Sequence, residues 1–492
     1  MPATIYATPG VYVEEISTLP PSIAEVGTAI PAFIGSTTNH DEKGPVVVKE
    51  VNSLRQYEDL FGRSPASPWQ VRFNPATGDF SLQDTQGKPV GPYSQPAALL
   101  WYAIDHYFRN GGSRCYVVSV AAAKADAPPS VEKFRNGLKE LERYDEPTLI
   151  LVPEASQLSL ANFGEVCEAA LAHAGKLQDR FVILDAKLGS SPGLTNEDLL
   201  ALRSSLGTQN LDRGAIYFPF LLTTLPHVFS EDSLEVIGLP SDQESSGSPD
   251  SAADVSSAMS GSDRTPPTTK ASAAPATLAS LATTRTSDYN VIKKLLTDQR
   301  VILPPSAAVA GVVVSVDRER GVWKAPANVS LQAVVAPVLQ LTDEDQAKLN
   351  IDANTGKSIN GIRSFAGKGT LVWGARTLAG NDNEWRYISV RRLFITIEES
   401  VKQATAFAVF EPNDSSTWLK VKGMIDSFLY SLWERGALQG AKPEEAFFVH
   451  VGLNKTMTSD DILNGLLIVE IGLAAVRPAE FISLRFSHKL AQ

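Results

Sequence analysis

Short apolar runs alternate with amphipathic segments along the first half of the chain. The runs at 148–152 and 181–185 each follow a segment of helical periodicity, at 131–143 and 159–174. Strands buried on both faces appear as such near-continuous apolar runs, because helices cover both sides of their sheet. The pattern predicts a mixed α/β fold with an at least partly parallel sheet. Further strands are expected at 32–35, 46–48, 114–118 and 215–218, and a further helix at 196–206.

Capping residues mark several helix boundaries. Ser53 precedes a helix that stops at Gly62, and a helix that opens at Pro96 ends in the Asn-Gly-Gly of 110–112. Serine satisfies free N–H groups of a first turn, and glycine adopts the left-handed conformation that ends many helices. The polar segment 63–92, rich in proline and glycine, is expected to form a hairpin or a long loop.

The first 22 residues look like an arm and not like part of a core. Four prolines exclude a helix, and 10–16 reads as one short strand with no local partner. Its backbone donors and acceptors must therefore be satisfied elsewhere. The side chains expected to take part in that pairing are Val11, Tyr12, Val13 and Ile16.

The last residues also read as a strand without a local partner. Between 480 and 490, apolar residues alternate with Ser483, Arg485 and Ser487, which is the pattern of a half-buried strand. The apolar face consists of Ile482, Leu484 and Phe486. Two arrangements satisfy both ends of the chain. Each terminus adds to a sheet in a neighbouring copy, or the two termini pair with each other inside one subunit.

The segment 241–288 consists mainly of Ser, Ala, Thr, Pro and Asp and contains no aromatic residue. Such a segment buries too little apolar surface to offset the entropy of the chain. It is expected to be a solvated insertion or linker, with a small surface decoration as the alternative.

The whole-chain composition excludes several functional classes. With 492 residues the chain is too long for one core, so two or three domains are expected. A net charge of -11 argues against nucleic acid as the main partner. Cys115 and Cys167 lie in apolar contexts and read as buried thiols. No secretory signal and no membrane-spanning run is recognised, so we expect the chain to be made and folded in a cytoplasm.

Two short segments resemble catalytic or phosphate-binding motifs, but each lacks a residue that the motif requires. The segment 189–193 (GSSPG) imitates a serine nucleophile elbow, but Pro192 lacks the N–H that an oxyanion hole needs after Ser191. The segment 356–358 (GKS) imitates a phosphate loop, but Ile351 occupies the place of its first glycine. The six histidines show no metal-ligand spacing. We therefore expect no catalytic residue, no metal and no cofactor.

A series of short motifs carries a resemblance to a known family. Between 321 and 481 they are 321–328 (GVWKAPAN), 359–362 (INGI), 372–378 (VWGARTL), 385–387 (WRY), 390–393 (VRRL), 410–413 (FEPN), Trp433 before 436–438 (GAL), and 477–481 (RPAEF). In this order they resemble the contractile tail sheath family of myophage-type tails, R-type bacteriocins and phage-derived extracellular injection systems. The segment 8–15 (TPGVYVEE) is similar to the family's opening, whereas 126–288 matches weakly.

The resemblance implies a multi-domain tail-sheath fold with extended N- and C-terminal β-arms. It implies a linking arm at 1–22, an outer α/β region at 23–325 interrupted by 241–288, an inner domain at 326–478 and a second arm at 479–492. It also implies stacked hexameric rings that interlock through these arms around an inner tube, with baseplate and terminal cap proteins as further partners.

A helix expected at 415–435 offers cations for contact with such a tube. Its apolar positions, predicted to face the core, are Trp418, Val421, Ile425, Phe428, Leu429 and Leu432. The candidate tube-facing residues are Lys420, Lys422 and Arg435. The alternative is an ordinary solvated helix face.

The sequence predicts a structural subunit that assembles and contracts to drive a tube through a target envelope, and not an enzyme. A non-contractile self-assembling shell or adhesin protein is one alternative, and a serine hydrolase centred on Ser191 is another. The particle would be a phage tail or a phage tail-like particle that can be released from the cell. Similarity at 28–35 (TAIPAFIG) favours a bacterial injection particle over an infectious phage.

Overall fold

The chain folds into two compact units. The computed structural model describes residues 23–124, 128–187, 194–239, 276–352 and 354–481. Among these residues, the large unit comprises those within 29–319 and 325–388, and the small unit comprises 23–28, 320–324 and 389–481.

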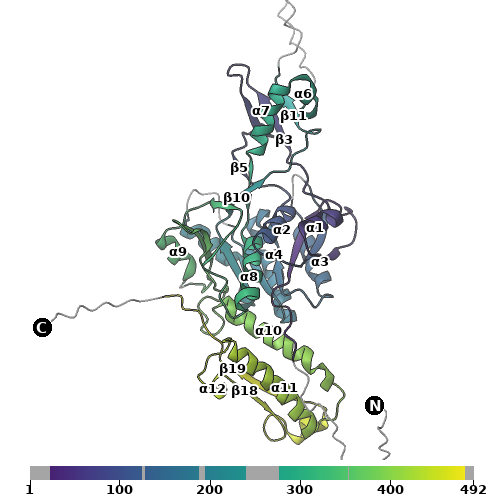
Figure 1. Cartoon of the computed structure of the whole chain (residues 1–492), viewed down its shortest axis with the longest axis vertical. Helices are drawn as coiled ribbons and strands as arrows, with labels where there is room; N and C mark the ends of the chain where they lie inside the picture. The colour runs from purple at the N-terminus through teal and green to yellow at the C-terminus, as the bar shows by residue number, and fades with distance from the viewer. Residues whose placement is uncertain (1–22, 125–127, 188–193, 240–275, 353, 482–492) are drawn as a thin grey trace, which may run out of the picture. The chain divides into compact units, whose positions relative to one another are not determined.

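A nine-stranded sheet forms the centre of the large unit (Figure 1), with the order β14-β17-β16-β9-β8-β7-β1-β6-β2. Its six inner strands are parallel, while β2, β17 and β14 add antiparallel at the two edges. The expected mixed α/β fold is therefore confirmed. The strands are β1 (Pro31–Thr37), β2 (Val47–Val51), β6 (Cys115–Ala122), β7 (Leu149–Leu151), β8 (Phe181–Asp185), β9 (Gly214–Phe218), β14 (Val329–Ser330), β16 (Asn360–Phe365) and β17 (Gly369–Val372).

Helices cover both faces of this sheet, as the apolar runs predict. Ile34 of β1 belongs to a buried cluster with Phe134 of α3. The next residue back along the strand, Phe33, points to the other face, where its ring centre lies 5.2 Å from that of Tyr107 in α2. The helices are α1 (Leu54–Phe61), α2 (Leu100–Arg109), α3 (Val131–Leu141), α4 (Leu160–Leu177), α5 (Asn196–Ser205), α8 (Ser306–Arg320) and α9 (Asp343–Asn350), with short 3-10 turns η1 (Pro153–Gln157) and η2 (Leu211–Arg213).

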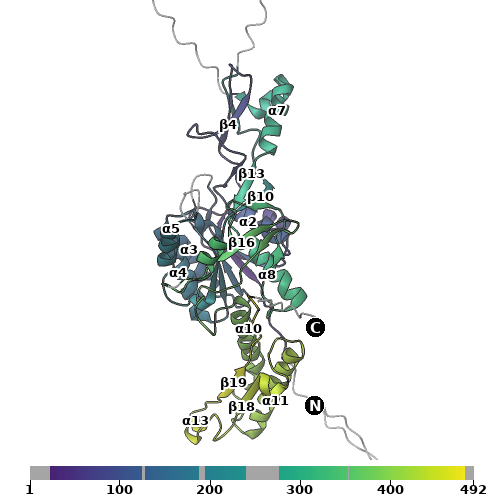
Figure 2. The same ribbon diagram turned by 90° about the vertical axis from the view of Figure 1, so that its left-hand side faces the viewer.

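Two four-stranded sheets complete the large unit (Figure 2). One contains β15 (Val334–Pro337), β10 (Leu221–Pro226), β13 (Arg300–Leu303) and β5 (Tyr93–Ser94). The other contains β12 (Ala276–Thr277), β11 (Glu235–Ile237), β3 (Trp69–Phe73) and β4 (Phe80–Asp84), with α6 (Leu278–Thr284) and α7 (Thr286–Thr297) packed beside it. The antiparallel pair of β3 and β4 is the hairpin expected within 63–92.

The Ser/Ala/Thr-rich segment differs from its expected solvated form in its last part. Residues 240–275 lie outside the described residues, but 276–288 form β12, α6 and the start of α7. Leu278 and Leu281 are buried there in one cluster with Trp69 of β3. Two leucines three residues apart share one helix face, so they suffice to anchor a helix in a stretch of otherwise weak composition. The β12 strand pairs with β11, and Ala276 lies opposite Val236.

The small unit contains α10 (Ile388–Ala404), the 3-10 turn η4 (Thr405–Ala408), α11 (Ser415–Glu434), α12 (Pro443–Ala446), β18 (Phe447–Val451), α13 (Ser459–Leu463) and β19 (Val469–Leu473). Its core also includes Ile23 and Trp323, so three separate pieces of the chain meet in it. The division at 389 differs from the inner domain expected at 326–478. Residues 325–388 belong to the large unit, because β16 pairs with β9 and thereby extends the central sheet, with Asn360 opposite Tyr217.

Candidate assembly interface

The small unit contains a two-stranded antiparallel sheet of β18 and β19, in which Val449 lies opposite Ile471. Along β18, Val449 and Val451 are buried, whereas Phe448 and His450 are exposed. Successive strand residues point to opposite faces, so one face of this sheet is covered and the other is open to solvent. The helix that lies beside the covered face is α11 (Figure 1).

The expected helix at 415–435 is present as α11. It begins after Asp414, whose carboxylate accepts hydrogen bonds from the N–H groups of Ser416 and Thr417. The positive end of the helix dipole also stabilises the negative charge of an aspartate at this position. Trp418 is half-buried at the start of the helix. The buried apolar residues are Val421, Met424, Ile425, Phe428, Leu429 and Leu432.

The register shows which backbone groups face outward from the sheet. The N–H of Ala474 donates to the C=O of Ala446 at 2.8 Å. Hydrogen-bonded and non-hydrogen-bonded pairs alternate along an antiparallel ladder, so the next bonded pairs are Phe448 with Gly472 and His450 with Glu470. The N–H and C=O groups of the residues between them point away from the partner strand. These residues are Phe447, Val449 and Val451 on β18 and Val469, Ile471 and Leu473 on β19.

The two edges of the sheet differ. At the β18 edge, the Nζ of Lys422 donates to the C=O of Val449 at 2.8 Å and to Asp426 at 2.8 Å. At the β19 edge, no described residue forms a hydrogen bond with the outward N–H and C=O groups. A row of unpaired backbone groups is a template to which another strand can add. The open edge of β19 is therefore the candidate site.

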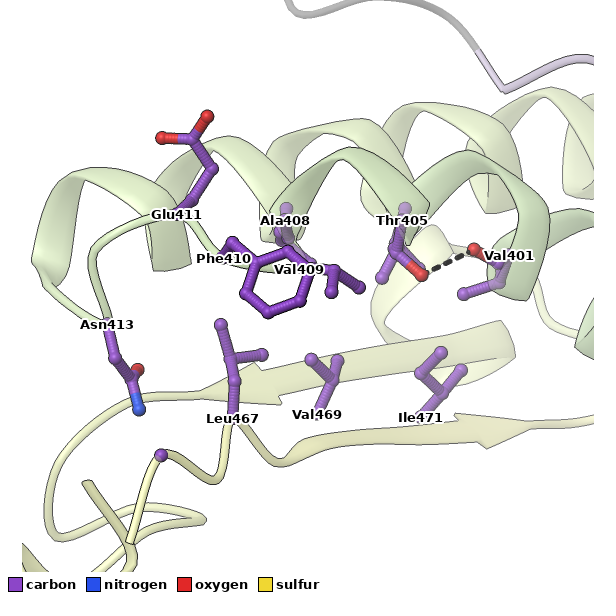
Figure 3. A pocket seen from close by; sticks show the side chains of 13 residues that line it. Val401, Thr405, Ala408, Val409, Phe410, Glu411, Asn413, Leu467, Val469 and Ile471 are labelled. Atoms are coloured by element: carbon purple, nitrogen blue, oxygen red, sulfur yellow. Dashed lines mark hydrogen bonds between the residues drawn. The ribbon is translucent and has the colours of Figure 1, made fainter. Parts of the chain in front are cut away.

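A groove of about 650 Å³ lies against β19. Figure 3 shows the side chains of Leu467, Val469 and Ile471 pointing toward the segment that follows α10. Val421 and Ile425 of α11 also line it. The lining is mainly aliphatic, so the groove suits the apolar side chains of an added strand.

Phe410 lies at this groove in an unusual conformation. Its backbone φ is +69°, in the left-handed region that bulky residues rarely adopt. Its side chain is fully exposed at 102%, and the neighbouring Val409 is 63% exposed. Figure 3 shows the Phe410 ring over the groove, near Leu467. A large aromatic residue is thus held on the surface beside the open edge of β19.

The crevice where α/β folds usually hold ligands is closed by a side chain. Such ligands bind beyond the carboxyl ends of the strands, at the point where neighbouring connections diverge. Here β1 pairs with β6 on one side and with β7 on the other. At the end of β1, the buried carboxylate of Glu154 accepts hydrogen bonds from Ser36 and from the N–H groups of Leu99 and Leu100 at the start of α2. A protein carboxylate therefore occupies the place that a ligand anion would take.

The remaining chemical motifs form no site in the described part of the chain. The elbow-like segment 189–193 lies outside the described residues. Lys357 of the GKS motif is buried, and its Nζ donates to the C=O of Arg203. Across the described ranges, no cluster of three or more His, Cys, Asp or Glu side chains is placed to hold a metal ion. Nor does any described helix have the length and apolar character that crossing a bilayer requires.

Known proteins resemble this chain. Residues 380–489 match the family described as phage tail sheath C-terminal domain. The tail sheath protein of Vibrio phage KVP40 is 27% identical over 141 residues, which are 29% of this chain. That match spans only 21% of the phage protein's length.

The solved structure of the anti-feeding prophage (AFP) helical sheath in its contracted state is 30% identical, with a TM-score of 0.63, and the match covers 99% of this chain and 100% of that chain. This chain belongs to the contractile tail sheath family. The sheath of an extracellular contractile injection system, PVC, in the contracted state is also similar, with 28% identity, a TM-score of 0.62 and 99% coverage of both chains. The expected family and its function as a contractile sheath subunit are thereby confirmed.

The residues predicted to take part in strand exchange between sheath subunits are not described by the structure. Val11, Tyr12, Val13 and Ile16 lie outside the described residues, as do Ile482, Leu484 and Phe486. Their part in strand exchange stays a prediction. The open edge of β19 and its groove, by contrast, belong to the described residues and were not among the residues expected from the sequence.

The three candidate tube-facing cations each have a partner within the small unit. The Nζ of Lys420 lies 4.5 Å from the ring centre of Phe407. The Nζ of Lys422 donates to the C=O of Val449 at the β18 edge. Arg435 forms an ion pair with Glu25 at 2.8 Å and lies over the ring of Trp323. Lys422 and Arg435 thus stabilise the unit itself, and tube contact by any of the three stays a prediction.

Proposed function

We propose that this chain is the sheath subunit of a phage-derived extracellular injection particle. It assembles as a helical stack of hexameric rings around an inner tube, and contraction of the stack drives the tube through a target envelope. The subunit carries out no catalysis. It is made in a bacterial cytoplasm, and its partners are further copies of itself, the tube protein, and baseplate and terminal cap proteins.

The open edge of β19 is the observation that supports this proposal most directly. A two-stranded sheet is marginal by itself, and additional strands stabilise it. The two terminal segments carry strand patterns and lack a local partner. Each terminus therefore adds to the small sheet of a neighbouring subunit.

Strand exchange has the strength that a contracting lattice needs. About six ladder hydrogen bonds contribute roughly 1 kcal/mol each, and two or three buried side chains contribute about 1.5–3 kcal/mol each. Such a connection survives while the subunits rotate as rigid bodies between two packings. Contacts with the tube must break during firing, so exposed charge pairs worth about 0–1 kcal/mol suit them.

Removal of the terminal segments tests this function. We expect that deletion of 1–18 or of 480–492 abolishes tube formation by the purified chain, because each deletion removes a donated strand. The measurement is negative-stain electron microscopy, with the unfolding temperature of the monomer as a check on folding. A variant in which 480–492 keep their composition but lose their alternation is the matched control, and it should fail like the deletion.

Tubes that form equally well after either deletion would contradict strand exchange. A non-contractile shell protein is distinguished in the same experiment, because a contractile sheath assembled on its tube has two lengths and a shell has one.

A further inference from the structure

We infer that His227 holds a separate lobe of the large unit to the central part of that unit, and that protonation of its imidazole releases the lobe in acid. The lobe, which we call the α6/α7 lobe, consists of β3, β4, β11, β12, α6 and α7 and has a buried apolar cluster of its own. The inference goes beyond the proposed function, because it concerns a single chain and does not depend on strand exchange.

Four connections join the α6/α7 lobe to the rest of the large unit. They run from α1 to β3 at 62–68, from β4 to β5 at 85–92, from β10 to β11 at 227–234 and from α7 to β13 at 298–299. The strands β5, β10 and β13 belong to one sheet, and Figure 2 shows β10 and β13 between the lobe and the central sheet. Because the lobe has its own core, its position depends on these connections.

His227 lies where the four connections meet, and we call this place the junction. Its Nδ1 lies 3.0 Å from the Oγ of Ser67 in the first connection, and its Nε2 lies 3.0 Å from the Oγ of Ser94, which follows the second connection. It is itself the first residue of the third connection. The fourth connection leads into Arg300, which lies opposite Pro226, the residue before the histidine. One imidazole thus contacts or adjoins all four connections.

Packing around the imidazole extends the junction into the lobe and into α2. The Trp69 ring of β3 lies 4.5 Å from the imidazole, and the Tyr102 ring of α2 lies 6.2 Å from it, measured between ring centres. The Tyr102 hydroxyl accepts the N–H of Val228 at 2.8 Å. The C=O of Val228 accepts the N–H of Ser67 at 2.9 Å. The lobe and α2 therefore pack against the same histidine.

The imidazole satisfies the junction only in its neutral form. Nε2 lies 3.2 Å from the C=O of Ser94, which can only accept, so Nε2 carries the proton. Nδ1 then accepts a hydrogen bond from the Ser67 hydroxyl. A second proton would turn Nδ1 into a donor and would place a charge on a side chain that is 3% exposed.

Among the described residues, no carboxylate forms a hydrogen bond with the ring to compensate for that charge. Tyr102 faces the ring from α2, and burial raises the pKa of its phenol, which therefore stays neutral. Arg300 on β13 and Arg63 in the first connection are cations. Burial lowers the pKa of His227 to about 4, although hydrogen bonds with the backbone at Ser94 and Arg300 oppose the shift.

The sign and the size of the effect follow from the two protonation equilibria. In the open junction the imidazole titrates near pH 6.5, whereas in the closed junction its pKa is about 4. The stability that the neutral imidazole gives the closed junction is present above about pH 6.5 and is lost as the pH falls toward 4. Between about pH 7.5 and pH 5 the population of the open junction should rise about thirtyfold.

Hydrogen–deuterium exchange of the purified full-length chain, measured by mass spectrometry at about pH 7.5 and pH 5, tests the inference. After correction for the intrinsic exchange rate, peptides that contain the amides of Ser67 and Val228 should exchange about thirtyfold faster at the lower pH, because both hydrogen bonds break when the junction opens. Peptides from α7 around the buried Ile292 and Leu296 should keep their protection, because the lobe moves as a folded body.

The variant His227→Gln removes the titration. The glutamine amide can still donate to the C=O of Ser94, but it does not ionise. Exchange at Ser67 and Val228 should therefore become independent of pH, whether it is slow or fast in this variant.

The matched control is His106→Gln. His106 is another buried histidine of the large unit, and burial lowers its pKa to about 4 as well. It lies in α2, where its Nε2 is 3.2 Å from the C=O of Gln332. This variant should keep the pH dependence of the wild type at the junction.

Three results would overturn the inference. They are equal corrected exchange of the wild-type junction at the two pH values, an unchanged pH dependence in His227→Gln, and a loss of protection in α7 that accompanies opening, since the lobe would then unfold and not be released. None of these results bears on tube formation, so the proposed function stands or fails separately.

Discussion

Two buried carboxylates cap helices of the large unit. Asp185, at the end of β8, accepts hydrogen bonds of 2.6 Å from both the N–H and the hydroxyl of Ser306, the first residue of α8. Glu154 accepts from Ser36 and from the start of α2. Burial raises the pKa of each carboxyl to about 7, although the hydrogen bonds oppose this shift. Both side chains therefore couple the stability of the fold to pH.

The sign of this coupling follows from the two states. In an unfolded chain these carboxyls titrate near pH 4, so between about pH 4 and pH 7 the folded protein binds more protons. The stability that Asp185 contributes is present below about pH 4 and is lost as the pH rises through about 7.

Asp185→Asn should reduce this pH dependence. The amide oxygen can accept the N–H of Ser306 while the amide nitrogen donates to its hydroxyl oxygen, so both hydrogen bonds persist without a titrating group. We expect the unfolding temperature of the variant to vary less than that of the wild type between about pH 5 and pH 8. Thermal denaturation followed by circular dichroism measures it, and parallel curves for the two proteins would contradict the expectation.

Glu154→Gln is the informative comparison, because each of the two carboxyl oxygens faces at least one backbone N–H, which can only donate. The N–H groups of Ser36, Leu99 and Leu100 and the Ser36 hydroxyl all point at the carboxylate. An amide NH₂ would face donors, so at about pH 8 the variant should lose about 1–3 kcal/mol of unfolding free energy in urea. Gly35 adds to this restriction, since a Cβ there would lie 2.8 Å from the Glu154 carboxylate. Equal stability of wild type and variant would show that the carboxylate is dispensable.

At the scale of elements, the sequence predicts the strands of the large unit well and those of the small unit poorly. Strands such as β8 are buried on both faces and stand out as apolar runs. The β19 strand contains Gly472, which interrupts its alternation. The ring of Phe448 lies across this glycine, and a Cβ would come within 2.1 Å of that ring, so a larger residue would require the ring to move. The groove itself joins 401–413 with 465–471, and no local pattern reports that contact.

The predicted contact of α11 with a tube can be tested more cleanly with one substitution than with two. Lys422 holds the C=O of Val449, so its reversal would disturb the sheet edge itself. Lys420→Glu removes only a contact with the Phe407 ring. We expect sheath polymers still to form and the extended state around the tube to be impaired. Lys442→Glu, another exposed cation of the same unit, is the control, and normal extended particles from Lys420→Glu would contradict tube contact.

At the scale of the molecule, family membership was predictable because its motifs are concentrated between 321 and 481, which overlaps the matched 380–489. The division into units was not predictable, because it depends on the parallel pairing of Asn360 with Tyr217, residues far apart in the chain. The long insertion was predictable as a change in composition, but its end was not, since two leucines decide where packing resumes.

The pairing of β11 with β12 has a practical consequence. Because Val236 lies opposite Ala276, the chain departs from and returns to the same spot on the large unit. What is inserted there should therefore impose no strain on the rest of the fold. An epitope grafted in place of 240–275 should be displayed once per protomer, and immunogold labelling along intact tubes would detect it. The sheath would then serve as a regular scaffold for foreign peptides.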